Sequence, residues 1–115
     1  ISFVIDGGGF ALTTGVKGDV YIPFNCTINS VTMLADQNGS VVVDIWKNTY
    51  ASYPPTAANT ITGSSVPTIS STTKYTDSTL SGWNVFITAG DTLRFNINSA
   101  TTITRLSVNL KITKT

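Results

Sequence analysis

Histidine and glutamate are absent from this sequence, and charged residues make up only 11% of it. These two residue types supply most general acids and bases in enzymes, so a common route to catalysis is missing. All six acidic residues are aspartates, and no spacing among them is typical of a pair of catalytic carboxylates. The single cysteine, Cys26, has no neighbour in the sequence that would activate its thiol. We therefore expect that the domain is not an enzyme.

The same shortages bear on metals and cofactors. Transition-metal sites need histidine or several cysteines, which leaves only a calcium site built from oxygen ligands. The segment Asp36-Gln37-Asn38-Gly39-Ser40 resembles part of a calcium loop, but the remaining acidic ligands are missing and a turn explains it. Gly7-Gly8-Gly9 is followed by no helical pattern, so it is not a phosphate-binding loop. We expect no metal and no cofactor.

Charge and hydropathy argue against two further classes of partner. Seven Lys and Arg residues balance six Asp to a net charge of +1, and the basic residues are scattered along the chain. Nucleic-acid binding needs a basic surface that neutralises phosphates, so this function is disfavoured. No run of about 18 apolar residues and no signal-peptide pattern occurs, so we expect no membrane insertion. With one cysteine no intrachain disulfide can form, and Cys26 is expected to be a small buried hydrophobe.

What the sequence has in abundance is Ser and Thr, 32 of 115 residues, together with two-residue alternation of apolar and polar side chains. The alternation is clearest near the C-terminus and predicts two half-buried strands there. A turn at Ala89-Gly90-Asp91 and another at residues 99–102 separate these strands from one another and from an earlier strand, so we expect a three-stranded meander. The apolar positions are Leu93, Phe95 and Ile97 in one strand and Leu106, Val108, Leu110 and Ile112 in the next.

Asn38-Gly39, flanked by apolar runs, is a strong signal for a hairpin with a type I′ turn. The residue numbers of each cross-strand pair would then sum to 77, which places Leu34 opposite Val43. Gly39 would have a positive φ in such a turn. The strand that follows is apolar on both faces, with Val41, Val43 and Ile45 on one side and Val42 and Trp46 on the other. We expect this strand to be central in a sandwich or covered by a partner chain, as in a homotrimer. Trp46 and Phe95 are expected to be core residues.

About eight strands and no sustained helical period predict an all-β fold, an antiparallel β-sandwich of jelly-roll-like form. With 115 residues and no compositional break, residues 1–115 form a single domain. Residues 48–82 are richer in Ser, Thr, Pro and Tyr than the rest. In this stretch Thr56 is expected to cap a helical turn, beside one or two short strands.

The loop after residue 47 is the best candidate for a binding site. Tyr50 and Tyr53 lie beyond the end of the strand rhythm, and Pro54-Pro55 restrict the backbone that carries them. Aromatic faces stack on sugar rings while polar neighbours bind the hydroxyls. The candidate ligand-binding residues are Asn48, Tyr50, Tyr53, Thr56 and Trp83. The alternative is that the tyrosines only cover the end of the sheet and that Trp83 plugs it.

The chain as a whole resembles a domain that recurs in phage tail-fibre and other virion appendage proteins. The resemblance spans nearly all 115 residues. Its most specific portions are Gly18-Asp19 with Ile22-Pro23-Phe24, residues 34–47, Tyr53-Pro54-Pro55-Thr56, Leu80-Ser81-Gly82-Trp83, and Ala89-Gly90-Asp91 with Leu93-Arg94-Phe95.

The resemblance implies a β-sandwich on the surface of a phage particle, commonly part of a homotrimer and a fragment of a longer virion protein. Its implied role is host attachment as a receptor-binding head that recognises a cell-surface carbohydrate. One alternative is a structural decoration or fibre-capping domain that contacts other virion subunits and binds no glycan. A weaker alternative is a carbohydrate-binding module of a polysaccharide-degrading enzyme.

Overall fold

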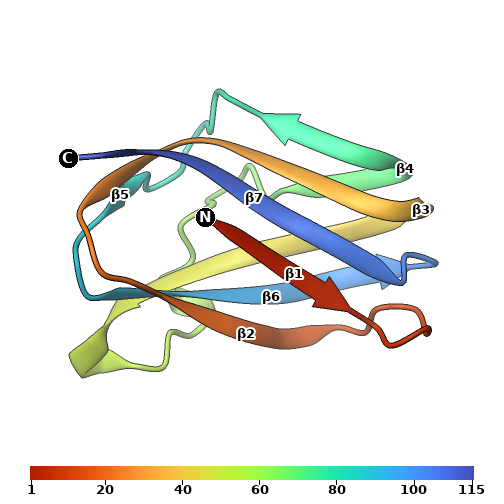
Figure 1. The fold of residues 1–115 in the computed structure, drawn as a ribbon, viewed down its shortest axis with the longest axis horizontal. Helices are drawn as coiled ribbons and strands as arrows, with labels where there is room; N and C mark the ends of the chain where they lie inside the picture. Colours follow the sequence, from red (N-terminus) through yellow and green to blue (C-terminus); the bar gives the residue numbers. More distant parts are fainter.

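The computed structural model describes all residues, 1–115, and its regular secondary structure is almost entirely antiparallel β-strand (Figure 1). Two single-turn 3-10 helices interrupt the loop between the third and fourth strands. The elements are β1 (Ser2–Asp6), β2 (Gly15–Ile22), β3 (Cys26–Thr49), η1 (Tyr50–Ser52), η2 (Ala57–Asn59), β4 (Thr68–Asp77), β5 (Phe86–Ile87), β6 (Asp91–Thr101) and β7 (Arg105–Lys114). The expected all-β class is confirmed, with seven strands rather than eight.

The strands form one curled sheet in the order β1-β7-β3-β6-β2, with β4 and β5 also paired to β3. The 24-residue β3 pairs with β7 through its first half and with β6 through its second half. The sheet therefore has two halves, one holding β1 and β7 and the other holding β6 and β2. The curl brings these halves face to face. As a result, the ring of Phe3 in β1 stacks on that of Phe95 in β6, with 4.5 Å between the ring centroids.

Period-two alternation places the apolar side chains inside this curl, which is where water is excluded. Leu93, Phe95 and Ile97 are buried as expected, as are Leu106, Val108 and Leu110. Cys26 is also buried, in agreement with its expected role as a small hydrophobe. The central position of the two-sided strand is confirmed, because Val41, Val43 and Ile45 of β3 are buried. Val41 lies between β4 and β6, and Val43 and Ile45 pair with β6.

The predicted hairpin at Asn38-Gly39 is wrong. Both residues lie inside β3, Gly39 has no positive φ, and Val43 pairs with Ile97 rather than with Leu34. Glycine is needed here for another reason. A Cβ on Gly39 would lie 2.6 Å from the carbonyl oxygen of Thr101, so only glycine allows this close approach of two backbones.

Gly39 marks the corner at which the sheet folds over, and Asp36 holds this corner together. Its carboxylate accepts hydrogen bonds from the amides of Thr104 at 3.2 Å and Arg105 at 3.0 Å, and from the hydroxyl of Thr104. Gln37 donates to the carbonyl of Thr102 at 2.7 Å. The segment that resembled a calcium loop therefore binds the turn between β6 and β7.

Two smaller expectations also fail for reasons of topology. The meander is wrong because β6 and β7 each pair with β3 and not with one another. The turn between them follows Thr101 and passes through Thr102, which has φ 73°, so it lies later than residues 99–102. Trp46 is not a core residue, because alternation along β3 sends it to the outer face, where it is half-buried.

Candidate functional site

The outer face of the β2-β6-β3 half carries a row of side chains from three neighbouring strands. Asp19 in β2 pairs with Arg94 in β6, and Arg94 pairs with Trp46 in β3. The residues on either side of Arg94, Leu93 and Phe95, point into the core, so the row is forced outward by alternation. A carboxylate, a guanidinium and an indole thus lie side by side on the surface.

Tyr53 joins this row from the loop after β3. Arg94 binds Asp19 with two parallel hydrogen bonds, Nε to Oδ1 at 2.7 Å and Nη2 to Oδ2 at 3.0 Å. The Tyr53 hydroxyl donates to Asp19 Oδ2 at 2.6 Å and accepts from Arg94 Nη2 at 3.2 Å. The guanidinium carbon lies 5.5 Å from the centroid of the Tyr53 ring, within the range of a cation–π contact. We call Asp19, Trp46, Tyr53 and Arg94 the aromatic platform.

The charges of the platform stabilise one another. The hydrogen bond from Arg94 is the main cause that lowers the pKa of Asp19, burial opposes it, and the hydroxyl of Tyr53 adds to the lowering. The hydrogen bond to Asp19 in turn raises the pKa of Arg94. Both groups therefore remain ionised near neutral pH, and together they carry no net charge.

Asp44 supports the platform from the same strand as Trp46. Its Oδ2 accepts from the indole Nε1 of Trp46 at 3.1 Å, which fixes the ring. Its Oδ1 accepts from the hydroxyls of Thr60 at 2.7 Å and Thr62 at 2.8 Å, and from the amide of Ile45 at 2.8 Å. One carboxylate thus attaches the loop after η2 to the outer face of β3.

The two tyrosines of the predicted site differ in their contacts. Tyr53 is 49% exposed and its hydroxyl is engaged by Asp19 and Arg94. Tyr50 is 77% exposed, begins η1, and its hydroxyl forms no hydrogen bond. The turn is closed by the amide of Tyr53, which donates to the carbonyl of Tyr50 at 3.2 Å. Tyr50 is therefore the more available ring.

Asn48 and Thr56 are used by the loop itself. The amide and hydroxyl of Thr56 donate to Asn59 Oδ1 at 2.8 and 3.3 Å, at the start of the expected helical turn, which the structure has as η2. Asn48 donates to the same oxygen at 3.4 Å. The two residues therefore meet at Asn59 and shape the loop that presents the tyrosines.

Trp83 lies apart from the other candidate residues. Its indole donates to the carbonyl of Ser65 at 2.9 Å, and the half-buried ring packs against the core. Trp83 has no hydrogen bond or ring contact with Tyr50 or Tyr53. This placement agrees with the alternative that Trp83 plugs one end of the fold.

Asp19 and Arg94 were not among the candidate residues from the sequence. They are separated by 75 positions, and their contact depends on the register between β2 and β6. Two other aspartates bind backbone amides in turns. Asp6 accepts from the amide of Gly8 at 2.8 Å, and Asp91 accepts from that of Thr88 at 2.9 Å.

Comparisons with protein-family models, with curated proteins and with solved structures find no match. Within the structure, no three His, Cys, Asp or Glu side chains come together as a metal-ligating group. The fold also contains no helix with the length and hydropathy needed to cross a bilayer. The platform thus presents the exposed ring of Tyr53 and the half-buried ring of Trp46 beside a carboxylate and a guanidinium.

Proposed function

We propose that this domain is a non-catalytic binding module of a phage virion appendage, such as the tip of a tail fibre, that recognises a host cell-surface carbohydrate. In this proposal the curled sheet is a jelly-roll-like β-sandwich carried on the surface of the phage particle. The sequence resemblance to tail-fibre domains supports the setting. The platform on the outer face of β2, β6 and β3 supports the activity.

The observation that carries the proposal is that charged side chains hold the aromatic rings in place through hydrogen bonds. The ring of Tyr53 is held by Asp19 and Arg94, and that of Trp46 by Asp44, so neither ring has to be ordered when a ligand arrives. Preorganised rings bind with a smaller entropy cost. Tyr50 adds a ring that is mostly exposed at the edge of the same loop.

The charges favour a neutral saccharide at this site. Arg94 is neutralised by Asp19 through two hydrogen bonds. Asp44 adds one negative charge that is already bound to Trp46 and two threonines. A neutral sugar can stack on the rings and exchange hydrogen bonds with these groups without meeting an unpaired cation.

A structural role in the virion is the second candidate, and large exposed apolar side chains away from the platform favour it. Phe10 in the loop after β1 and Phe86 in β5 are both exposed, as is Val4 in β1. Such residues could contact other virion subunits, including further copies in a homotrimer. The outer face of β3 gives less support to a trimer, because Asp44 interrupts its apolar residues.

A glycan array separates the two candidates. The purified domain should bind a subset of neutral bacterial surface polysaccharides. Tyr50→Ala should lose that binding while keeping its melting temperature, because the Tyr50 side chain is mostly exposed and its hydroxyl has no partner in the fold. Val4→Ser, a change on the other half of the sheet, is the matched control and should bind normally. Failure of the domain to bind any surface glycan, combined with its capture by purified fibres, would favour the structural role.

A further inference from the structure

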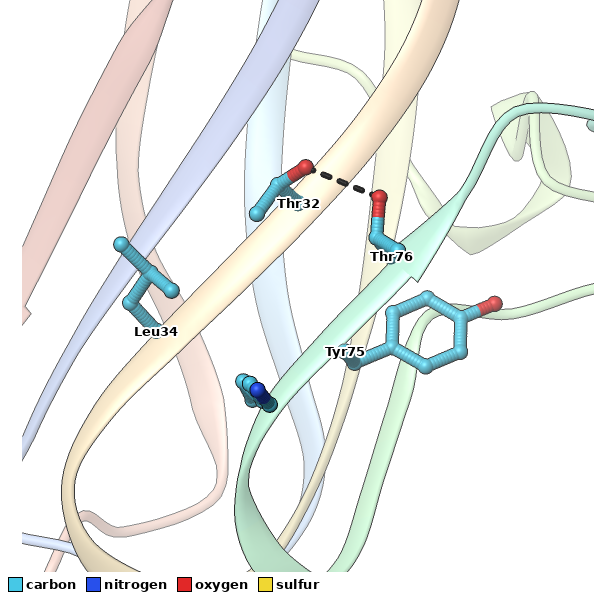
Figure 2. A pocket seen from close by; sticks show the side chains of 5 residues that line it. Thr32, Leu34, Tyr75 and Thr76 are labelled. Carbon is cyan, nitrogen blue, oxygen red and sulfur yellow. Dashed lines mark hydrogen bonds between the residues drawn. The ribbon is translucent and has the colours of Figure 1, made fainter.

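A groove lies on the opposite half of the sheet, away from the platform, over the last paired residues of β3 and β4 before an irregularity in their pairing. Leu34 pairs with Lys74, but the next paired position is Gly39 with Thr72, so four residues of β3 face only Thr73 of β4. Beside this irregularity lies a hollow of about 530 Å³, lined by Thr32, Leu34, Lys74, Tyr75 and Thr76 (Figure 2). This volume is within the range of small-ligand sites.

The groove offers both apolar and hydroxyl groups. The hydroxyls of Thr32 and Thr76 lie 3.0 Å apart and face one another across the two strands, with Leu34 and Tyr75 on opposite sides of the pair (Figure 2). Only one hydrogen is used between the two hydroxyls, so the other remains free to bind a ligand. Leu34 is 51% exposed and provides an apolar wall.

Lys74 gives the groove an unpaired positive charge. The two ion pairs of the structure join Lys47 to Asp91 and Arg94 to Asp19, and Lys74 takes part in neither. A smaller hollow of about 270 Å³ on the other side of Leu34 contains Arg105, but it also contains the carboxylate of Asp36. Of these two hollows, the one beside Lys74 therefore has a cation with no carboxylate in its lining.

We propose that this groove is a second ligand site, specific for a carboxylate-bearing saccharide unit such as a uronic acid. Lys74 binds the carboxylate, the hydroxyls of Thr32 and Thr76 bind ring hydroxyls, and Leu34 packs against an apolar face of the sugar. The site differs from the platform in charge, because the platform pairs its guanidinium with Asp19 whereas Lys74 is free. The two sites therefore select different saccharides.

The test is to titrate the domain with glucuronate while following the chemical shifts of its backbone amides. Glucose, which lacks the carboxylate, is the neutral control. Glucuronate up to about 100 mM, well above a millimolar Kd, should shift the amides of the five groove residues, and glucose should not. Lys74→Gln should weaken glucuronate binding at least about threefold, as expected for a solvent-exposed ion pair. Lys111→Gln, at an exposed lysine of β7 outside the groove lining, should leave it unchanged.

The outcomes for the two sites are independent. Tyr50→Ala should leave glucuronate binding in the groove intact, so a failure of the platform does not imply a failure of the groove. The proposal is overturned if the groove amides do not shift with glucuronate, if glucose shifts them equally, or if Lys74→Gln and Lys111→Gln behave alike.

Discussion

Removing the hydroxyl of Tyr53 measures how strongly the loop after β3 is held on the sheet. Tyr53→Phe deletes the bonds to Asp19 at 2.6 Å and Arg94 at 3.2 Å and keeps the ring. Hydrogen bonds to charged groups contribute about 1.5–3 kcal/mol. Tyr53 is 49% exposed, so water replaces part of the interaction and we expect a loss of about 1 kcal/mol in the free energy of unfolding. This corresponds to a fall in Tm of about 4 °C for a domain of this size.

Urea unfolding followed by tryptophan fluorescence provides the measurement, and Tyr50→Phe is the matched control. The Tyr50 hydroxyl has no partner, so its loss should change stability by less than about 0.5 kcal/mol. Arg94→Met tests the mechanism, because Tyr53→Phe should cost less in that background, with a coupling energy of at least about 0.5 kcal/mol. Wild-type stability in Tyr53→Phe, or equal losses for both tyrosines, would refute this account of the platform.

Three further predictions concern the charges and the corner of the fold. The pKa of Asp19 is lower in the folded state, so the stabilisation by its carboxylate is present above the unfolded pKa near about 4 and is lost as pH falls through the folded pKa. The Tm of Asp19→Asn should therefore fall less than that of the wild type between about pH 5 and pH 2.5. Gly39→Ala should lower the free energy of unfolding in urea by about 1–3 kcal/mol, because the new Cβ clashes with the carbonyl of Thr101, whereas Asn38→Ala should be nearly neutral. Comparable losses for the two variants would instead favour a two-residue turn. Asp36→Ala should speed amide hydrogen exchange at Thr104 and Arg105, and unchanged exchange would show that Asp36 does not hold the corner.

The parts of the fold that could be predicted are those set by burial. A strand with one face in the core must alternate, so Leu93, Phe95 and Ile97 identified both a strand and its inner face. Apolar residues on both faces of residues 41–46 likewise identified a central strand. These patterns depend only on which side of a strand water reaches.

The corner at Gly39 could not be predicted because its cause lies far away in the sequence. Asn-Gly is the usual pair for a tight turn, and nothing near Asn38 indicates that the backbone of Thr101 will approach it. Gly39 is therefore required by a tertiary contact, not by the tight turn that the local sequence suggested. The same error produced the false meander, because a continuous β3 separates the pairing of β6 from that of β7.

Only the two tyrosines of the candidate site could be predicted. The end of the strand rhythm near Lys47 placed Tyr50 and Tyr53 in a loop, and the structure has them there. Their charged neighbours could not be found, because a bulge between Val16 and Gly18 sets the register that places Asp19 beside Arg94. A shift of one residue in that register would turn Asp19 to the other face of the sheet.

The most direct test of the central claim is to locate a bound glycan on the domain. A neutral saccharide identified by array should be titrated into the domain while the chemical shifts of backbone amides and the two indole groups are followed. Our account predicts that the largest changes occur at Trp46, Tyr50, Tyr53 and Arg94, and that they disappear in Tyr50→Ala. Changes confined to other surfaces, or binding that survives Tyr50→Ala unaltered, would contradict it.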